Sequence, residues 1–593
     1  MNLITIDVEI YENYFLLSAL NSANGKVKHF EMYEGQPLNK PALMKLMSDN
    51  TTLSFNGNNF DLPIIVAALS GWPVSKLKGL CDKIIQSNAP SWMICRDYKL
   101  QIPDRWDHID IIEVAPGMVS LKVYGGRLHY ATIQDLPIEP SALISPAERA
   151  TLRDYCVNDL QTTYALYSAL EKQVDLRVSM SEQYGVDLRS KSDAQIAETV
   201  IKSELQKKTG KQYRKPELPD GVTFKYQDPH IVEFQTKQLQ DMFKTVLAIS
   251  FGLGANGAVK MPPELAKSKI KIGYAEYTMG IGGLHSCEKA QLVVAGKDEH
   301  LIDVDVASYY PNIILQQALA PKSMGAPFLK VYQSIVDRRI RAKHSGDKVT
   351  ANTLKIVVNG SFGKLGSKWS ALYAPELMLQ TTITGQLALL MLIEAFELAG
   401  LRVYSANTDG VVVKCKADQV DTMRNICFDW MLSTSYELEE THYKGLASRD
   451  VNNYVAVTTD GELKRKGVFA SGGLAKNPDC NICFTAVGEL LANGIPLSET
   501  IVKCKDVTQF VTVRKVTGGA KWRDEYLGKA VRFYYSKNVD LSINIEYVKN
   551  GNKVPKSDGA KPLMTLPDTM PADVDYKRYI AMSEELLKGV GYA

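Results

Sequence analysis

The sequence has few cysteines, and their spacing does not suggest a disulfide framework. Nine cysteines are scattered over 593 residues, and an odd, irregular set indicates reduced thiols in a cytosolic compartment. Cys480 and Cys483 form one C-x-x-C pair, but a structural zinc site needs four ligands, and no second pair or nearby histidine completes this one. We therefore expect packed thiols and a cytoplasmic protein.

Long hydrophobic runs and a strong charge imbalance are also missing. The apolar stretch Leu387–Ile393 is far shorter than the roughly 20 residues that a membrane-spanning helix needs, so we expect no membrane association. The N-terminal segment has no basic residues before its first acidic residue, Asp7, so we expect no signal peptide. A net charge of +3 means that a nucleic-acid partner would require a local basic surface, balanced by acid elsewhere.

Hydrophobic periodicity predicts both strands and helices, in a chain long enough for about four structural units. Residues 1–20 favour two strands around a turn near Glu12–Asn13. A helix is expected over Pro146–Lys172, with Ser145 as its N-cap and Glu148 completing a capping box. Residues 175–290 mix helical pieces with Pro and Gly breaks. Further strands are expected at Thr52–Phe55, Leu301–Val306, Arg402–Ala406 and Val411–Cys415, and further helices after Asp61 and at Val331–Lys343, Val349–Val358 and Thr384–Ala399.

Three short segments in the second half of the chain combine acidic, basic and aromatic residues. Taken singly, each is more often a strand cap, a solvated helix face or a turn. The turn-rich tetrad in the third segment lies between two apolar runs, which predicts a hairpin. The segments are Asp305-Val306-Ala307-Ser308-Tyr309-Tyr310-Pro311, Lys355-x-x-x-Asn359-Gly360-Ser361-Phe362-Gly363 and Ala406-Asn407-Thr408-Asp409-Gly410.

Together these segments supply what nucleotidyl transfer requires. Asp305 and Asp409 can converge from neighbouring strands, and hard divalent cations about 3.5–4 Å apart prefer carboxylate ligands. Lys355 and Asn359 share one helix face, with Lys348 two turns earlier, so a cation would meet the developing phosphate charge. Residues 330–368 carry nine basic and only two acidic side chains, which favours a nucleotide or DNA partner over a solvated helix.

The three segments resemble the A, B and C motifs of family B DNA polymerases, whose patterns are D-x-x-S-L-Y-P, K-x-x-x-N-S-x-Y-G and D-T-D-S. The resemblance implies that Asp305, Val306 and Asp409 bind two Mg²⁺ ions, for which Mn²⁺ can substitute. It implies that Tyr310 stacks under the sugar and sterically excludes a ribose 2′-hydroxyl. The sequence departs from the patterns at Asn407, Gly410, Gly360 and Phe362. The further nucleotide-binding residues that the resemblance implies are Lys355, Asn359, Lys348, Arg341 and Ser308, with Arg338 and Lys343 as alternatives to Arg341.

A second set of acids lies near the N-terminus. Asp7 and Glu9 leave the same face of a predicted strand. Asp61 closes an Asn-x-x-x-Phe-Asp segment, and Tyr155 precedes Asp159 by one helical turn. Four carboxylates can hold two metals for phosphodiester hydrolysis, with the phenol orienting the attacking water. Each piece alone is more often surface acid.

In order and spacing these segments resemble the Exo I, II and III motifs of the same polymerase family. The resemblance implies an active 3′→5′ proofreading exonuclease. Ser120-Leu121-Lys122 resembles the element that grips the single-stranded primer. By resemblance, Asn56, Phe60, Ser120 and Leu121 contact single-stranded DNA.

Other segments resemble duplex-binding parts of the family. Tyr454 matches the tyrosine of a K-x-Y element, although Asn452 stands in place of the lysine. Lys464 and Lys466 lie in a segment that resembles the basic strand that follows the K-x-Y element in the family. By the same resemblance Gly363, the last residue of the second motif, contacts DNA. Gly280-Ile281-Gly282-Gly283 resembles the glycine-rich link between the exonuclease and polymerase modules, and basic and aromatic residues near 517–534 suit a DNA-gripping thumb or a packed core with a basic rim.

The sequence thus predicts an RNase H-like exonuclease followed by a right-hand polymerase. The expected boundaries are exonuclease 1–170, a connector of uncertain fold 171–290, palm 291–326 and 365–470, fingers 327–364, and thumb and C-terminal region 471–593. The compact size resembles that of bacteriophage replicases. The short spacings between the motifs leave little space for the insertions of protein-primed members, so we expect use of an ordinary primer-template.

Expected partners are primer-template DNA, dNTPs, single-stranded DNA at the exonuclease site and accessory replication proteins, and the protein is expected to be a monomer. The alternatives are an exonuclease with an inert polymerase half and a non-catalytic DNA-binding protein.

Overall fold

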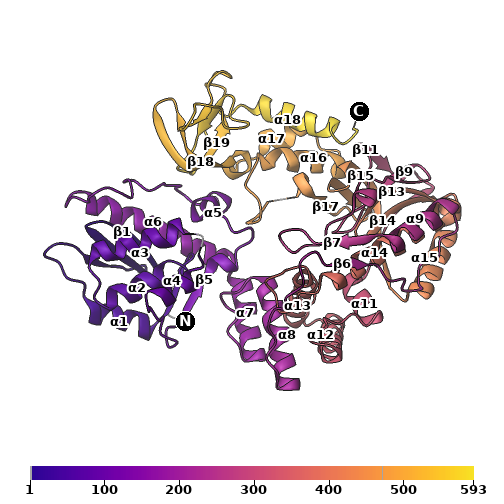
Figure 1. Cartoon of the computed structure of the whole chain (residues 1–593). Helices are drawn as coiled ribbons and strands as arrows, with labels where there is room; N and C mark the ends of the chain where they lie inside the picture. The colour runs from indigo at the N-terminus through magenta and orange to yellow at the C-terminus, as the bar shows by residue number, and fades with distance from the viewer. Residues whose placement is uncertain (1–2, 88, 471, 593) are drawn as a thin grey trace. The chain divides into compact units, whose positions relative to one another are not determined.

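The computed structural model describes residues 3–87, 89–470 and 472–592, which form two compact units (Figure 1). Unit 1 comprises Met1–Ser192, Gly472–Ile482 and Lys503–Tyr579. Unit 2 comprises Asp193–Ser471, Cys483–Val502 and Ile580–Ala593. Both units mix helices with sheets, so the predicted α/β (α+β) class is confirmed at that level. The division falls inside the predicted connector 171–290 and splits the predicted region 471–593 between the units, while the functional assignment of the domains stays a prediction.

The first sheet of unit 1 has five strands in the order β3-β2-β1-β4-β5. β1 pairs antiparallel with β2 and parallel with β4, so the sheet is mixed. The predicted strand pair around Glu12–Asn13 and the strand near Thr52 are confirmed. The strands are β1 (Leu3–Tyr11), β2 (Tyr14–Asn21), β3 (Val27–Met32), β4 (Thr51–Ser54) and β5 (His108–Asp110); the accompanying helices are α1 (Lys40–Asp49), α2 (Asp61–Leu69), α3 (Val74–Gln86), α4 (Ser91–Asp97), α5 (Leu121–Arg127), α6 (Glu148–Ala169) and α7 (Glu171–Tyr184).

Helix α6 begins two residues later than predicted, and Ser145 is not its N-cap. The Glu148 carboxylate accepts hydrogen bonds from the Ser145 backbone N–H (2.8 Å) and from the Ser145 hydroxyl (2.6 Å). Because that hydroxyl donates to Glu148, it does not cap the helix, and Ala147 occupies the N-cap position. Only half of the predicted capping box therefore forms.

A second sheet of unit 1 comes from the C-terminal part of the chain. Its order is β20-β18-β19-β21, with β18 (Thr512–Trp522), β19 (Glu525–Tyr535), β20 (Ile545–Tyr547) and β21 (Ala560–Pro562). Arg532 on β19 is completely buried. Its guanidinium donates to the backbone carbonyls of Tyr130, Ala131, Leu563 and Met564 at 2.7–3.0 Å. One side chain thus joins this sheet to a loop just over 400 residues earlier.

We expect Arg532→Met to lower the free energy of unfolding of unit 1 by about 3–5 kcal/mol, because four hydrogen bonds from a fully buried guanidinium are lost together. Burial lowers the pKa of the guanidinium to about 10, so it stays charged at neutral pH. Urea unfolding followed by circular dichroism measures the change. Lys529→Met, an exposed position on the same strand, is the matched control. Equal midpoints for the two variants would contradict the proposed anchoring role.

Unit 2 is built around a ten-stranded sheet of order β17-β16-β15-β12-β14-β13-β10-β9-β8, with β11 also pairing with β15. The predicted strand that leads to Asp305 and the predicted hairpin around Asp409 are both confirmed. The strands are β8 (Ile270–Ile272), β9 (Ala275–Met279), β10 (Leu284–Ser286), β11 (Gln291–Val294), β12 (Glu299–Val306), β13 (Arg402–Asn407), β14 (Gly410–Lys416), β15 (Leu438–Asp450), β16 (Asn453–Thr458) and β17 (Leu463–Lys466).

Helices pack on this sheet, and one of them forms much of the core. α14 (Pro375–Leu398) begins nine residues before the predicted Thr384, because Pro375 is well tolerated in a first helical turn. It is long and apolar enough to span a bilayer, but 78% of its most apolar window is buried within the protein, as in a core helix. The other helices are α9 (Lys237–Ala248), α10 (Pro263–Ala266), α11 (Tyr309–Gln316), α12 (Ala326–His344), α13 (Lys348–Leu365) and α15 (Val420–Thr434). The division between the units falls within α16 (Asn481–Asn493), α17 (Leu497–Lys503) and α18 (Tyr576–Lys588).

The segment that the sequence left unreadable contributes a helix to the region of the second motif. α8 (Asp193–Thr209) packs beside α13 in unit 2 (Figure 1). A Cβ at Gly360 would lie 2.7 Å from the Ala197 Cβ and 3.0 Å from the Asp193 carbonyl oxygen. Glycine at 360, where the family pattern has serine, is therefore explained by the close approach of these two helices. The rest of the segment includes the short strands β6 (Thr223–Lys225) and β7 (Ser250–Gly252).

Candidate active sites

Asp305 and Asp409 lie next to each other in unit 2. Asp305 is the penultimate residue of β12 and lies directly opposite Gly410 of β14, and the Val306 N–H donates to the Asp409 carbonyl at 2.7 Å. A Cβ at Gly410 would lie 2.2 Å from an Asp305 carboxylate oxygen. Glycine thus replaces the serine of the family pattern because any side chain there would occupy the space of the Asp305 carboxylate.

A third carboxylate, which the sequence analysis did not single out, joins this pair. Asp303 is two residues before Asp305, so both side chains leave the same face of β12. Asp303 is buried and accepts a short hydrogen bond from the Tyr443 hydroxyl, with the Lys464 ammonium 3.6 Å away. The same i, i+2 spacing that drew attention to Asp7 and Glu9 was available in the sequence as a signal.

Burial of these acids, and after it their mutual repulsion, raises the pKa values of Asp305 and Asp409. Burial, followed by the charges of Asp303 and Asp409, raises the pKa of Asp305 to about 7. Desolvation also raises the pKa of Asp409, although the Lys466 cation opposes the shift. Carboxylates that lie this close repel one another when they are ionised. A divalent cation would neutralise them, so this group is suited to bind one.

A cavity of about 340 Å³ opens beside the carboxylates. It gathers residues from all three sequence segments, including six of the predicted site residues. Asp305 does not line it, although Val306 and Asp409 do. Lys348 at the start of α13, Arg341 and Gly363 do not line it either, and these three are exposed. The lining residues are Val306, Ser308, Tyr309, Tyr310, Pro311, Arg339, Lys355, Asn359, Phe362, Thr408 and Asp409.

Arg339, not Arg341, is the arginine of α12 at this cavity. The buried face of the helix runs through Tyr332, Ile335 and Val336, and Arg339 follows three to four residues later on that face. Its guanidinium donates to the Ser308 hydroxyl at 2.9 Å. The sequence predicted Arg341 here, with Arg338 and Lys343 as alternatives. Arg338 is half-buried like Arg339, so only the packing of the helix identifies which arginine faces the cavity.

Tyr310 is held firmly at the cavity wall. Its ring stacks on Tyr309 at 6.0 Å and 13°, and packs on Phe362 at 4.4 Å. Its hydroxyl donates to the Gly282 carbonyl at 2.6 Å. The glycine-rich segment 280–283 therefore lies at this site. A Cβ at Gly283 would lie 2.8 Å from the Thr408 hydroxyl oxygen, which explains the glycine there.

Asn407, which replaces the first aspartate of the third motif, acts as a hydrogen-bond donor. Its amide nitrogen donates to the Val451 carbonyl at 3.0 Å and more weakly to the Asn452 side-chain oxygen at 3.3 Å. A carboxylate cannot make either bond. The asparagine therefore ties the hairpin to the turn between β15 and β16.

We expect Asn407→Asp to destabilise the protein by about 1–2 kcal/mol, because the Val451 carbonyl loses its donor. The added charge, two residues from Asp409, should also lower the Mg²⁺ concentration needed for half-maximal activity, because a further carboxylate attracts the cation. Chemical unfolding and a Mg²⁺ titration measure the two effects. Asn452→Asp adds the same charge but keeps the acceptor, so unfolding that is equally impaired in both variants would refute the donor role.

The predicted DNA-binding residues of unit 2 flank the carboxylates. Tyr454 on β16 pairs with Lys466 on β17, and the Lys466 ammonium lies 5.9 Å from the Tyr454 ring centre. Lys464 reaches Asp303, as described above, and its ammonium donates to the Thr441 hydroxyl at 3.3 Å. A basic strand thus borders the acidic group, while its contact with DNA stays a prediction.

The N-terminal acids meet in unit 1. Oxygen atoms of Asp7 and Glu9 on β1 and of Asp159 on α6 all lie within 4.8 Å of one another. Asp61, only 2% exposed at the start of α2, is close enough for its pKa to be raised by Asp7 as well as by burial, which is the larger cause. One Asp61 carboxylate oxygen is buried without a hydrogen-bond partner among the described residues. These four oxygen donors fit divalent cations.

Burial also dominates the proton affinity of this group. It raises the pKa of Asp7 to about 7 and the pKa of Glu9 well above its usual value, and neighbouring acids add to both shifts. The Cys156 thiol donates to the Asp7 carboxylate at 3.3 Å. No sequence pattern indicated this contact, because a cysteine inside a helical pattern is usually an ordinary core residue.

Lys122 is a residue whose role the sequence analysis missed. Its ammonium donates to the two Asp159 carboxylate oxygens at 2.6 and 2.5 Å and to the Tyr155 hydroxyl at 2.6 Å. It thereby holds together the two residues of the Tyr-x-x-x-Asp segment. Lys122 belongs to the Ser-Leu-Lys element that the sequence analysis quoted, so the residue itself was already noted. Its contact with Tyr155 and Asp159 is known only from the fold.

The other residues predicted to hold single-stranded DNA surround this group on loops and helix starts. Asn56 has a left-handed backbone (φ 68°), and its N–H donates to the Asp110 carboxylate at 2.8 Å. Phe60 and Ser120 occupy the N-cap positions of α2 and α5, and Leu121 is buried. Their contacts with DNA stay a prediction.

Raised carboxyl pKa values make the effect of Mg²⁺ depend on pH. With folded-state pKa values near 7, Asp7 and Asp305 bind protons that the unfolded chain releases above about pH 4, so the metal-free protein loses stability as pH rises from about 4 to 7. Mg²⁺ binds the anions, so it should raise the unfolding midpoint by a few degrees at about pH 8 and far less at about pH 5.5. Thermal unfolding at both pH values tests this. The combined Asp7→Asn and Asp305→Asn variant is the control, and an unchanged Mg²⁺ response in it would contradict binding at these groups.

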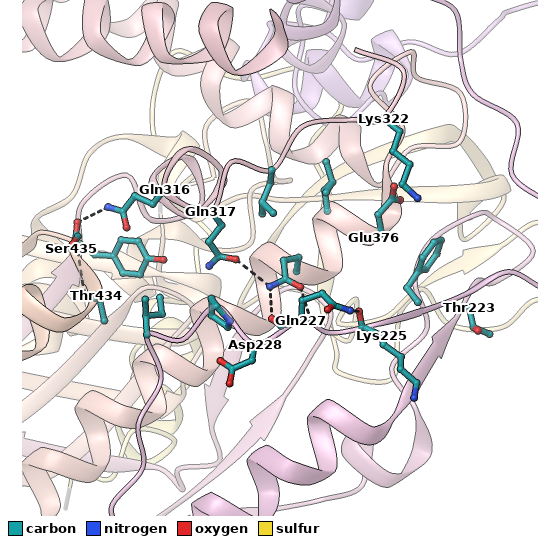
Figure 2. Close-up of a pocket in the computed structure, with 17 residues that line it drawn as sticks. Thr223, Lys225, Gln227, Asp228, Gln316, Gln317, Lys322, Glu376, Thr434 and Ser435 are labelled. Carbon is teal, nitrogen blue, oxygen red and sulfur yellow. Dashed lines mark hydrogen bonds between the residues drawn. The ribbon is translucent and has the colours of Figure 1, made fainter. Parts of the chain in front are cut away.

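A further cavity of about 960 Å³ lies elsewhere in unit 2 (Figure 2). No predicted site residue lines it. Glutamine amides gather on its walls, and Gln380 both accepts from the Gln227 N–H (3.0 Å) and donates to the Gln227 carbonyl (2.7 Å). Gln316 donates to the Ser435 carbonyl at 2.6 Å. The two Gln380 bonds fasten the 223–229 segment to α14, and the Gln316 bond joins α11 to the residue after α15, so the polar wall has a structural explanation.

Comparison with known proteins does not identify the function, so the functional assignment rests on the site residues. No protein-family model and no curated protein sequence matches the chain. Among solved structures, it is similar to the family B DNA polymerase from the hyperthermophilic archaeon Pyrobaculum calidifontis, with a TM-score of 0.42 and 16% identity. The match covers 100% of this chain and 77% of that one. A likeness this distant does not decide function.

Proposed function

We propose that this chain is a template-directed DNA polymerase of the family B type with a 3′→5′ proofreading exonuclease. One observation carries the proposal: Asp409, which lies next to Asp305, lines a cavity that Lys355, Asn359 and Tyr310 also line. Acidic oxygens for metals, a cation for phosphate charge and an aromatic wall for a sugar thus come together from three segments far apart in the sequence.

In the polymerase site, Asp305 and Asp409 would hold two Mg²⁺ ions, with Val306 as a further contact. The bound ions would activate the primer hydroxyl and stabilise the departing pyrophosphate. Lys355 and Arg339 place cations on the cavity wall, where they favour the triphosphate and the charge that develops during transfer. The Tyr310 ring, braced by Phe362, leaves no room for a ribose 2′-hydroxyl.

In the exonuclease site, Asp7, Glu9, Asp61 and Asp159 would hold the ions that assist hydrolysis of the terminal phosphodiester. Tyr155, fixed by Lys122, would orient the attacking water. The mixed sheet of order β3-β2-β1-β4-β5 supports an RNase H-like assignment. Proofreading follows from competition, because a mismatched primer end frays at less cost than a paired one and reaches this site more often.

The remaining expectations belong to the same proposal. Palm, fingers and thumb would lie mainly in the segments expected from the sequence, with α8 added to the fingers. The protein would act as a monomer on an ordinary primer-template in the cytoplasm of a phage-infected cell, away from membranes and with accessory replication proteins as further partners. Single-stranded DNA would enter the exonuclease site past Asn56, Phe60, Ser120 and Leu121.

A primer-extension gel with Mg²⁺, run with and without the four dNTPs, tests the proposal. Extension with dNTPs and shortening without them would support it. Shortening under both conditions would favour an exonuclease with an inert polymerase half. A mobility shift without either reaction would favour a non-catalytic DNA-binding protein.

A further inference from the structure

Trp369 is a large aromatic side chain that the structure leaves in water. It lies in the loop after α13, six residues beyond Gly363, and is 73% exposed. Two ammonium groups lie beside its ring, those of Lys215 at 5.1 Å and Lys368 at 5.2 Å from the ring centre. A tryptophan of this exposure contributes little to the core, so its position with two lysines needs another explanation.

The loop that carries Trp369 is fixed in place. The Glu198 carboxylate of α8 accepts from the Ala371 N–H at 3.0 Å and lies 3.5 Å from the Lys364 ammonium. Lys368 donates to the Ala255 carbonyl at 2.9 Å. The indole is therefore presented on a rigid support, which lowers the entropy that a ligand must remove.

The surrounding charge selects an anionic partner. Lys215 ends a run in which no acid occurs between Glu204 and Glu217. All five basic side chains of this run are exposed. A cavity of about 550 Å³ adjoins the platform and includes Lys215, Lys368 and two acids, Glu217 and Asp220. The basic residues of the run are Lys207, Lys208, Lys211, Arg214 and Lys215.

We infer that Trp369, Lys215 and Lys368 form a platform for single-stranded DNA, on which one unpaired base stacks while the lysines attract the flanking phosphates. Proteins that hold single strands combine aromatic faces with basic grooves in this way. Duplex DNA does not fit the platform, because its base faces are already stacked on each other. Resting on the proposed function, the strand is the unpaired template.

Binding measurements on the full-length protein test the platform. Metal is removed with EDTA so that neither synthesis nor hydrolysis occurs, and the probe is oligo(dT) beside a strand of equal length without bases. Trp369→Ala should weaken oligo(dT) binding by about 5- to 150-fold, the range that one base–aromatic stack contributes, and should leave binding of the abasic strand unchanged. Trp369→Phe keeps a stacking ring and should restore most of the affinity.

Two matched variants sharpen the result. Trp92 in unit 1 is 64% exposed with Arg96 5.8 Å from its ring, so Trp92→Ala controls for loss of an exposed indole. Oligo(dT) should quench the tryptophan fluorescence of the wild-type protein and of Trp92→Ala to a similar extent. In Trp369→Phe the part of the quenching that comes from Trp369 should be absent. Lys215→Gln should reduce the salt dependence of binding by about 0.7 in log–log slope. The inference is overturned if Trp369→Ala binds oligo(dT) like wild type, or if it loses affinity equally for the abasic strand.

The template assignment has its own readout. On a primer-template with a long 5′ overhang, Trp369→Ala should raise the KM for DNA, whereas a one-nucleotide overhang should give a wild-type KM. An equal rise on both substrates would refute the template assignment. Wild-type protein that binds oligo(dT) through Trp369 but extends neither substrate would instead refute the proposed polymerase function, so the two failures are distinguishable.

Discussion

Asp305→Asn should abolish primer extension while leaving degradation of a 3′ end intact. The substitution keeps the shape of the side chain but removes one of the two anions that would hold Mg²⁺. We expect incorporation to fall by roughly 10³-fold or more, the scale on which loss of one charge-stabilising group lowers a rate. Degradation should stay within about twofold, because the second set of carboxylates is in unit 1.

Single-turnover incorporation of one dNTP measures this effect, and shortening of a labelled primer without dNTPs measures the other activity on the same preparation. Asp429→Asn, an exposed acid on α15 in the same unit, controls for the charge change. Extension at wild-type rates by Asp305→Asn would exclude the carboxylate pair as the catalytic centre.

The opposite pattern is expected for Asp7→Asn. Asp7 lies within 4.8 Å of Glu9 and Asp159, so its neutralisation should remove a shared metal ligand and reduce 3′ degradation by roughly 10³-fold or more. Extension from a paired primer should be unchanged, whereas extension past a terminal mismatch should leave the wrong base in the product. Sequencing of products made from a mismatched primer detects this loss of proofreading.

The control for this variant is Asp49→Asn, an exposed acid at the end of α1. If Asp7→Asn still shortens primers normally, the N-terminal acids are not the hydrolytic site. If it loses extension as well, the two reactions do not have separate centres, and the division of labour proposed between the two groups of acids fails.

The parts of the fold that the sequence predicted well are those with a simple repeat. The strand before Asp305 and the hairpin around Asp409 show apolar alternation and turn residues, and both exist. α8 was not predicted, because its segment is followed by Pro and Gly breaks and its stability comes from contact with α13. Tertiary packing of that kind leaves little trace in a local pattern.

The candidate sites show the same limit. Residue type and spacing pointed to Asp7, Glu9 and Asp159, which the structure brings together. Lys122 and Arg339 were missed as site residues because a lysine or arginine in a helix is usually solvated, and only packing shows that each faces an acidic or nucleotide-sized space. The departures at Asn407, Gly360 and Gly410 were unexplained from sequence, since their neighbours come from distant segments.

Unit 1 is assembled from pieces made at different times during translation. The carbonyls of Tyr130 and Ala131 leave the ribosome about 400 residues before Arg532, the side chain that satisfies them. The nascent N-terminal segment must therefore wait, with those groups in water or on a chaperone, until almost the whole protein has been synthesised. A ribosome that stops early would release a fragment that has Asp7, Glu9, Asp61 and Asp159 but lacks Arg532, so unit 1 can be completed only after almost the whole chain has been made.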